Sequence, residues 1–122
     1  MRQVILAFVG ETAHRPTALL ALREYARPSA AFPVVYEGVV APLHKAVAAI
    51  VGAADERPAD EPAVILRAHA LLGQCLGFAI ARPIVCRRLG WSDYTPERIE
   101  QVVEVATATA LRALDLPQPA AD

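Results

Sequence analysis

One stretch of the chain, residues 60–82 (DEPAVILRAHALLGQCLGFAIAR), is apolar around nearly its whole circumference when it is drawn as a helix. Its strongly polar side chains between positions 63 and 81 are Arg67, His69 and Gln74. An ordinary surface helix has one apolar stripe and a polar face opposite to it. A helix that is apolar on every side must be covered by protein or by lipid. This requirement constrains the fold more than any other feature of the sequence.

Lipid is one candidate for that cover. The stretch approaches the roughly 20 residues that span a bilayer, and Gly73 and Gly77 have the spacing that lets membrane helices pack closely. However, Arg67 and His69 would place ionisable groups in hydrocarbon. No one-sided Lys or Arg cluster and no Trp or Tyr belt brackets the stretch. We therefore favour a buried helix with its own domain on one side and a second copy on the other. A small membrane-associated protein built on the Gly73/Gly77 helix is the alternative.

The composition indicates a single domain, residues 1–122, with an oligomeric interface. The chain is 55% hydrophobic and 20% charged, and a small monomer has difficulty hiding that much apolar surface. A net charge of −1 gives no general attraction to nucleic acid. The opening MRQVILAFVGE is too short and too weakly charged for a signal peptide. Cys75 and Cys86 would lie roughly 16 Å apart on one helix, too far for a disulfide. These features predict a cytoplasmic protein.

Helix formers, prolines and glycines predict an all-α fold of about five helices. No segment carries a convincing strand or hairpin signal. Residues 4–9 are too few for periodicity to separate a strand from a helix. The expected helices cover residues 17–26, from 29–32 to about 51, 60–82 with a second segment at 84–89, and 95–114.

Several residues set the expected boundaries. Pro42 predicts a kink or break near residues 38–40, and residues 52–60 predict an exposed loop. Asp60 is the expected cap of the central helix, and Pro83 should interrupt its end. Two further signals are Gly90, expected to close residues 84–89 in a left-handed conformation, and Thr95-Pro96-Glu97, expected to start the last helix.

No catalytic or metal-binding motif is present in the sequence. The histidines His14, His44 and His69 lack the spacing of metal ligands. His69 and Cys75 lie on different faces of their helix. No Gly-rich phosphate loop, paired-carboxylate motif or nucleophile elbow occurs. We therefore expect neither enzymatic activity nor a metal or other cofactor.

Lone polar side chains within the apolar helices suit a small-molecule pocket with a few orienting groups. The simpler alternative is that each of them is satisfied locally or reaches the surface, as Arg67 can do near the start of its helix. Helix-face positions select the following ligand-binding candidates: Arg23, Tyr36, Val40, His44, His69, Gln74 and Phe78.

Four pieces of the chain, in order, resemble the C-terminal domain of TetR-type transcriptional repressors, in the branch that regulates drug-sensitivity and efflux genes. The pieces are LREYARPSAAF at 22–32, VVAPLHKAVAAIVG at 39–52, HALLGQCLGFAIARPIVCRRLGW at 69–91 and YTPE at 94–97. The resemblance implies an all-helical domain that binds a small apolar or amphipathic effector between its earlier helices and the central one.

The resemblance also implies a homodimer held by a four-helix bundle of residues 60–82 and 95–114 from each copy. The expected interface residues are Leu72, Gly73, Gly77, Ile99, Val103, Ala106, Ala110 and Leu114. TetR-type repressors read DNA through an N-terminal helix-turn-helix domain, and no such pair of helices is evident in this sequence. We therefore expect DNA contact only through a domain absent from these residues, and no contact with a membrane.

Overall fold

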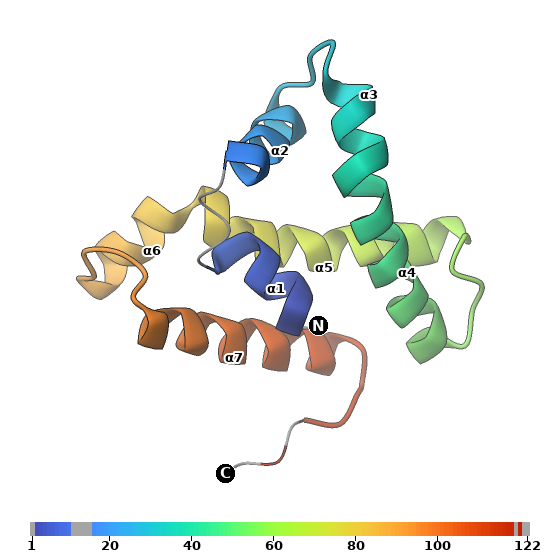
Figure 1. Ribbon diagram of the computed structural model, residues 1–122. Coiled ribbons are helices and arrows are strands. Elements are labelled where there is room, and N and C mark those ends of the chain that lie inside the picture. Colours follow the sequence, from blue (N-terminus) through green and yellow to red (C-terminus); the bar gives the residue numbers. More distant parts are fainter. Residues whose placement is uncertain (1, 11–15, 119, 121–122) are drawn as a thin grey trace.

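The computed structural model describes residues 2–10, 16–118 and 120, and these residues form helices joined by turns, with no strand among them (Figure 1). The predicted all-α class is confirmed. His14 lies outside the described residues. The helices are α1 (Arg2–Val9), α2 (Pro16–Ala26), α3 (Phe32–Val35), the π-helical segment η2 (Tyr36–Val40), α4 (Ala41–Asp55), α5 (Pro62–Ile80), α6 (Arg82–Leu89) and α7 (Pro96–Ala113).

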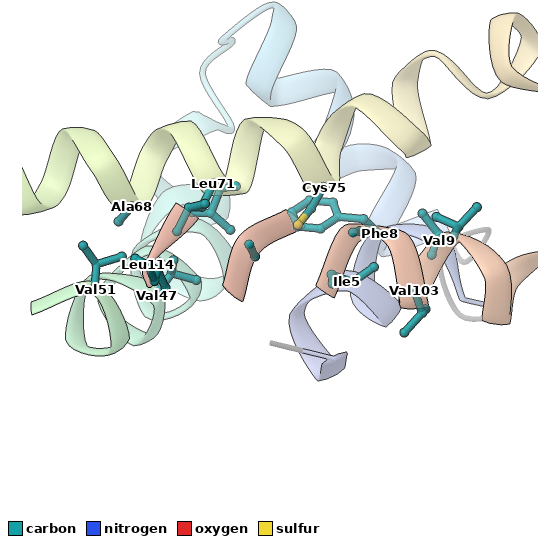
Figure 2. Close-up of a cluster of buried hydrophobic side chains, with 14 of the residues drawn as sticks. Ile5, Phe8, Val9, Val47, Val51, Ala68, Leu71, Cys75, Val103 and Leu114 are labelled. Atoms are coloured by element: carbon teal, nitrogen blue, oxygen red, sulfur yellow. The ribbon is translucent and has the colours of Figure 1, made fainter. Parts of the chain in front are cut away.

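The central helix α5 packs with α1, α4 and α7 around one core (Figures 1 and 2). Residues 4–9, which the pattern left open, are helical in α1 because Ile5, Phe8 and Val9 then share one buried face. They meet the side of α5 that carries Ala68 and Cys75. Both cysteines are buried and free, which confirms the expected absence of a bridge between them.

The side of α5 that faces away from this core is bare within one chain. Two helical stretches, Phe32–Asp55 and Pro62–Ile80, are long and apolar enough to cross a membrane by length and composition. Only 28% of the apolar window of Pro62–Ile80 is buried within the chain. Five of the exposed residues form one stripe at alternating spacings of four and three: Leu66, Ala70, Gly73, Gly77 and Ile80. We call this stripe the outer face of α5.

The predicted kink before Pro42 is confirmed and takes the form of a π-helical turn. Proline has no N–H to donate to the carbonyl four residues earlier, and its ring displaces that carbonyl. The chain absorbs the disruption by widening the helix over η2 without breaking it. A small separate cluster of Ala21, Val35 and Val40 packs α2 against α3 and η2.

Two predicted boundaries around the α4–α5 loop are wrong. Helix α4 continues to Asp55, past the expected end near Val51, because the loop folds back onto the helix at Gly52. A Cβ at this glycine would lie 2.7 Å from the Arg57 carbonyl oxygen. Asp60 does not cap α5, since the cap position is Glu61 and it makes no side-chain cap bond. The Glu61 carboxylate instead accepts a hydrogen bond from Arg57 Nε at 2.9 Å.

The signals at the C-terminal end of α5 behave as predicted. Helix α5 stops at Ile80 and α6 begins at Arg82 with Pro83 in its first turn. Gly90 closes α6 with φ of 68°, and the Thr95 hydroxyl accepts the Arg98 N–H to start α7. Tyr94 donates a hydrogen bond from its hydroxyl to the Phe78 carbonyl at 2.8 Å and so ties this connector to α5.

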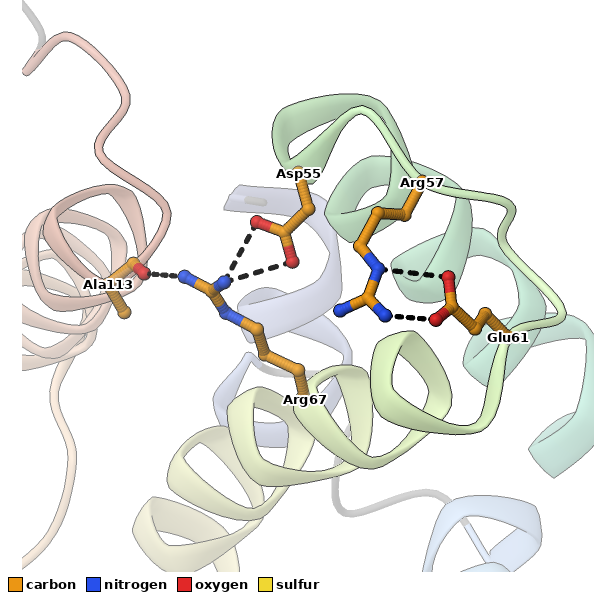
Figure 3. Close-up of polar contacts among 5 residues, drawn as sticks. All are labelled: Asp55, Arg57, Glu61, Arg67 and Ala113. Atoms are coloured by element: carbon orange, nitrogen blue, oxygen red, sulfur yellow. Dashed lines mark hydrogen bonds and ion pairs between the residues drawn. The ribbon is translucent and has the colours of Figure 1, made fainter.

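Arg67 is partly exposed, and its guanidinium joins three helices (Figure 3). Its guanidinium donates to both carboxylate oxygens of Asp55 at 2.8 and 2.9 Å and also to the carbonyl of Ala113. Asp55 ends α4 and Ala113 ends α7. The contact therefore fixes the C-terminal ends of two helices on the first half of α5, and the polar residue that interrupts the apolar sequence has a structural role.

We predict that Arg67→Met lowers the free energy of unfolding by about 1 kcal/mol, because it keeps the apolar stem and removes charge-assisted hydrogen bonds at a partly exposed site. Urea unfolding at an unchanged m value measures the effect. The matched control is Arg57→Met, which removes an exposed pair within one turn and should cost less than about 0.5 kcal/mol. Equal losses in the two variants would contradict the role assigned to Arg67.

Candidate functional site

A cavity of about 230 Å³ lies between α1, α2 and α5. Its apolar wall reaches into the core at Phe8 and Leu72 and continues through Leu76. Its outer edge includes Gly73 and Ile80, which also belong to the outer face of α5. The polar residues of the lining are Tyr25 and His69, and the described lining contains no Asp, Glu, Lys or Arg. An apolar hollow with a few convergent polar groups is the usual composition of a small-molecule site.

The Tyr25 hydroxyl is buried and has no hydrogen-bond partner among the described residues. The side chain lines both this cavity and a smaller one of about 80 Å³ between α1, α2, η2 and α4. Burial raises the pKa of Tyr25, so the phenol stays protonated and can both donate and accept. A buried hydroxyl left unpaired costs about 1–3 kcal/mol, and such an atom calls for a ligand or solvent partner.

The turn after α2 holds this tyrosine in place. The buried Glu24 carboxylate accepts hydrogen bonds from the Ser29 N–H at 2.8 Å and from the Ser29 hydroxyl at 2.6 Å. These bonds hold the pKa of Glu24 below its ordinary value. They close the turn between α2 and α3 and fix the last turn of α2, where Tyr25 lies beside Glu24.

His44 of α4 and His69 of α5 form a stacked pair. Their ring centroids are 5.5 Å apart with an interplanar angle of 21°, and Nε2 of His44 lies 3.3 Å from Nδ1 of His69. Burial, and then the neighbouring His69, lower the pKa of His44. One imidazole can donate to the other while at least one of them is neutral, whereas two protonated rings repel each other. Within the part of the chain that is described, no three potential metal ligands cluster.

A second hollow of about 490 Å³ lies on the other side of this pair, between η2, α4 and the start of α5. It is larger than the first, but most of its lining is exposed, and it includes the charged residues Lys45 and Asp60. His44 lines this hollow and His69 lines the first, so the imidazole pair stands between them. We regard the first cavity as the better site because its described lining has no charged residue and includes the unpaired buried hydroxyl of Tyr25.

The structure brings some of the predicted ligand-binding residues together and separates the others. His44 and His69 are in contact, and Tyr36 lines the second hollow with His44. Val40 is buried in the small cluster beside α2, and Phe78 packs against the main core. Arg23 and Gln74 are exposed and line neither hollow.

The predicted interface residues also divide into two groups. Gly73 and Gly77 are exposed, and a Cβ built at either would meet nothing within 4 Å. The remaining residues are at most 9% exposed and lie in the core of a single chain, and their place at an interface between copies stays a prediction. These core residues are Leu72, Ile99, Val103, Ala106, Ala110 and Leu114. The small-residue stripe of α7 therefore serves the fold of one chain.

Sequence reasoning missed Tyr25 and the apolar residues that surround it. The three-residue spacing of Leu22 and Tyr25 puts them on one helix face, which indicates burial but gives no information about the Tyr25 hydroxyl. Phe8 and Leu76 carried no signal beyond their apolarity. The burial of a tyrosine at the end of a helix, next to a proline-containing turn, was the available hint, since a buried phenol needs a partner.

Known proteins resemble this chain over most of its length. A family model described as the C-terminal domain of the HTH-type transcriptional dual regulator CecR matches residues 1–115. The curated HTH-type transcriptional dual regulator CecR of Shigella flexneri is 32% identical over 85 residues. That alignment covers 70% of this chain and 38% of the relative, so the chain corresponds to well under half of the relative's length.

We predict that the unfolding midpoint falls less steeply with acidification in His44→Gln than in the wild type. The folded-state pKa of His44 lies below its ordinary value of 6.5, so unfolding favours proton uptake there. The stability contributed by neutral His44 is present above about pH 6.5 and is lost as the pH falls through the folded-state pKa. Urea midpoints between about pH 7.5 and about pH 5.5 measure the slope.

Two carboxylates with lowered pKa, Glu24 and Glu100, titrate below this window and should affect both proteins equally. Parallel curves for the wild type and His44→Gln would contradict the assignment of the slope to His44.

Proposed function

Because this chain belongs to the family of CecR C-terminal domains of TetR-type transcriptional regulators, we propose that it is the segment of such a regulator that senses a small molecule and pairs two copies. The sensing site in this proposal is the cavity between α1, α2 and α5. The pairing surface is the outer face of α5. The transcriptional role itself follows from the family, whereas the ligand site and the pairing surface are proposed from the geometry.

The observation that carries the proposal is the bare outer face of α5. Leu66 and Ile80 at its two ends are 70% and 56% exposed, and Ala70, Gly73 and Gly77 between them leave a shallow, unobstructed surface. The alternating spacing of four and three residues is the repeat that lets two helices interlock along a seam. A contiguous apolar surface of this kind on a small protein marks a contact site.

A second copy suits this face better than lipid does. His69 and Gln74 are exposed beside the stripe, near the middle of α5. Hydrocarbon offers no hydrogen-bond partners to such groups at that depth. The rim of a protein interface is polar and wet, so these side chains remain hydrated there. Val105 of α7 is also 58% exposed and gives the second helix of the proposed bundle an apolar contact.

The two proposed activities meet on α5. Gly73 and Ile80 line the cavity and also belong to the outer face. A second copy seated on that face would cover the edge of the cavity. Ligand binding that shifts α2 relative to α5 would therefore alter the contact between copies. A ligand acts in this way only to the extent that it binds one arrangement more tightly than the other.

DNA contact belongs, in this proposal, to a helix-turn-helix segment such as the one named in the relative's description, and not to the helices described here. The alignment covers only 38% of the relative, so that longer protein has room for such a segment outside the aligned part. Dimerisation of this domain would then set the separation of two DNA-reading units. A transcriptional regulator of this kind works in the cytoplasm, and we propose that location.

We predict that the wild type sediments as a dimer at micromolar concentration and that Ala70→Glu weakens the dimer by at least about a hundredfold. Each dimer would bury two carboxylates on an apolar seam without partners. Ala70 is exposed in the single chain, so the variant should keep its helical circular dichroism. Analytical ultracentrifugation measures the dissociation constant.

Two alanine controls separate the pairing surface from the core. Ala49→Glu, on the exposed side of α4, should leave the dimer intact. Ala110→Glu should unfold the chain, because Ala110 is 2% exposed in its own core. A folded wild-type monomer would refute the pairing surface, and recovery of the wild type only in detergent would favour the membrane alternative.

We predict that toluene at about five times its Kd stabilises the wild type by about 1 kcal/mol, because an apolar cavity of this size accepts small apolar probes. The expected signal is a higher thermal midpoint. Ala26→Leu, which adds volume at the cavity lining, should reduce the effect, whereas Ala59→Leu at the second hollow should not. An unchanged midpoint for the wild type at saturating toluene would refute the cavity as the sensing site.

A further inference from the structure

The lining of the cavity limits the charge of any ligand. Its described residues include no carboxylate, ammonium or guanidinium group. An ion that entered it would lose its hydration without gaining a charged partner, which is costly. The polar groups that remain are the Tyr25 phenol and the His69 imidazole, whose Nδ1 is engaged with His44. A neutral hydrogen-bonding ligand therefore matches the lining better than an ion does.

The volume limits the size of the ligand. Pockets for drug-sized molecules are typically about 300–1,000 Å³, and this cavity is about 230 Å³. A compact, single-ring molecule matches this volume better than a fused polycyclic one. The adjoining space of about 80 Å³ beyond Tyr25 can hold no more than a small substituent.

The Tyr25 hydroxyl supplies the specific contact. It is buried and unpaired among the described residues, and its side chain stands between the two spaces with Phe8 beside it. The Glu24–Ser29 hydrogen bonds fix the last helical turn of α2, which contains Tyr25, so the hydroxyl is positioned before a ligand arrives. A site with a pre-positioned, unsatisfied hydroxyl gains most from a ligand that brings one hydrogen-bonding group to it.

We propose that the ligand is a small, uncharged, single-ring molecule with one hydroxyl or carbonyl group, and that the Tyr25 hydroxyl is the group that recognises it. This inference rests on the proposed sensing role of the cavity and goes beyond it by naming the ligand class and the anchoring residue. Tyr25 contributes hydrogen-bond specificity, and the apolar wall contributes the remaining affinity.

The test compares toluene with p-cresol, which differs from it by one hydroxyl, on the wild type and on Tyr25→Phe by calorimetric titration. The variant should bind p-cresol about five- to tenfold more weakly than the wild type does, because one hydrogen bond is lost. Its affinity for toluene should be unchanged or slightly higher. Tyr36→Phe, at the exposed tyrosine of the second hollow, is the matched control and should bind both probes as the wild type does.

A third probe, p-toluate, tests the charge requirement, and it should bind the wild type at least about tenfold more weakly than p-cresol at neutral pH. A measurement on the wild type alone covers the case in which Tyr25→Phe does not fold. Nuclear Overhauser contacts should link the p-cresol ring protons next to its hydroxyl group to the ring protons of Tyr25 and not to those of Tyr36.

The outcomes distinguish this inference from the proposed function. If Tyr25→Phe binds p-cresol as tightly as the wild type, or if p-toluate binds more tightly than p-cresol, the ligand class and the anchor are refuted while the cavity remains a binding site. Nuclear Overhauser contacts with Tyr36 in place of Tyr25 would refute the anchor in the same way. If the wild type binds neither toluene nor p-cresol, the sensing role of the cavity fails with them.

Discussion

The central helix α5 needs cover on every side, and the rest of the structure depends on how that need is met. The chain covers one side with α1, α4 and α7, whose side chains interlock with Ala68, Leu71 and Cys75. It leaves the opposite side bare, and that side carries the stripe that we call the outer face, with exposed His69 and Gln74 beside it. A helix half covered in this way is stable in water only if something else covers the remainder. Arg67 shows that a charged group fits on α5 where a helix end supplies its partners.

The arrangement of the remaining helices follows from the disruption before Pro42. The π-helical segment joins α3 to α4 in one continuous helix, in which α4 packs on α5 and α3 contacts α2. This holds α2 across α5 and leaves the cavity between them. π-helical turns are often found where a fold positions a site, and this one shapes the wall that carries Val39 and Leu43 beside the smaller space.

Helix boundaries could be predicted from the sequence where a single residue determines them. Contacts between helices could not, because each helix face can pack against more than one neighbour. Pro83, Gly90 and Thr95 act through backbone geometry, which local sequence determines. The α7 residues predicted for the dimer interface, Ile99, Val103, Ala106 and Ala110, form a packing stripe, but periodicity does not say whether the neighbour of that stripe is the same chain or another. It proved to face α1 and α5. The Tyr25 hydroxyl is unpaired because, among the described residues, the neighbouring helices place no polar group beside it. A local sequence pattern cannot show this.

The residues that carry the family resemblance divide by role in an informative way. Gly90, Trp91 and Tyr94 close the junction between α6 and α7, and the Tyr94 hydroxyl ties it to α5. These residues stabilise the fold and give no information about a ligand. The cavity is lined instead from α1, α2 and one edge of α5, and that edge borders the outer face. The α6–α7 junction is fixed at one end of α5, and the cavity borders the bare face near the middle of the same helix. The proposed ligand binding and the proposed pairing would therefore share α5. Coupling between them then needs only a small movement of α2, provided that the ligand favours one position over the other.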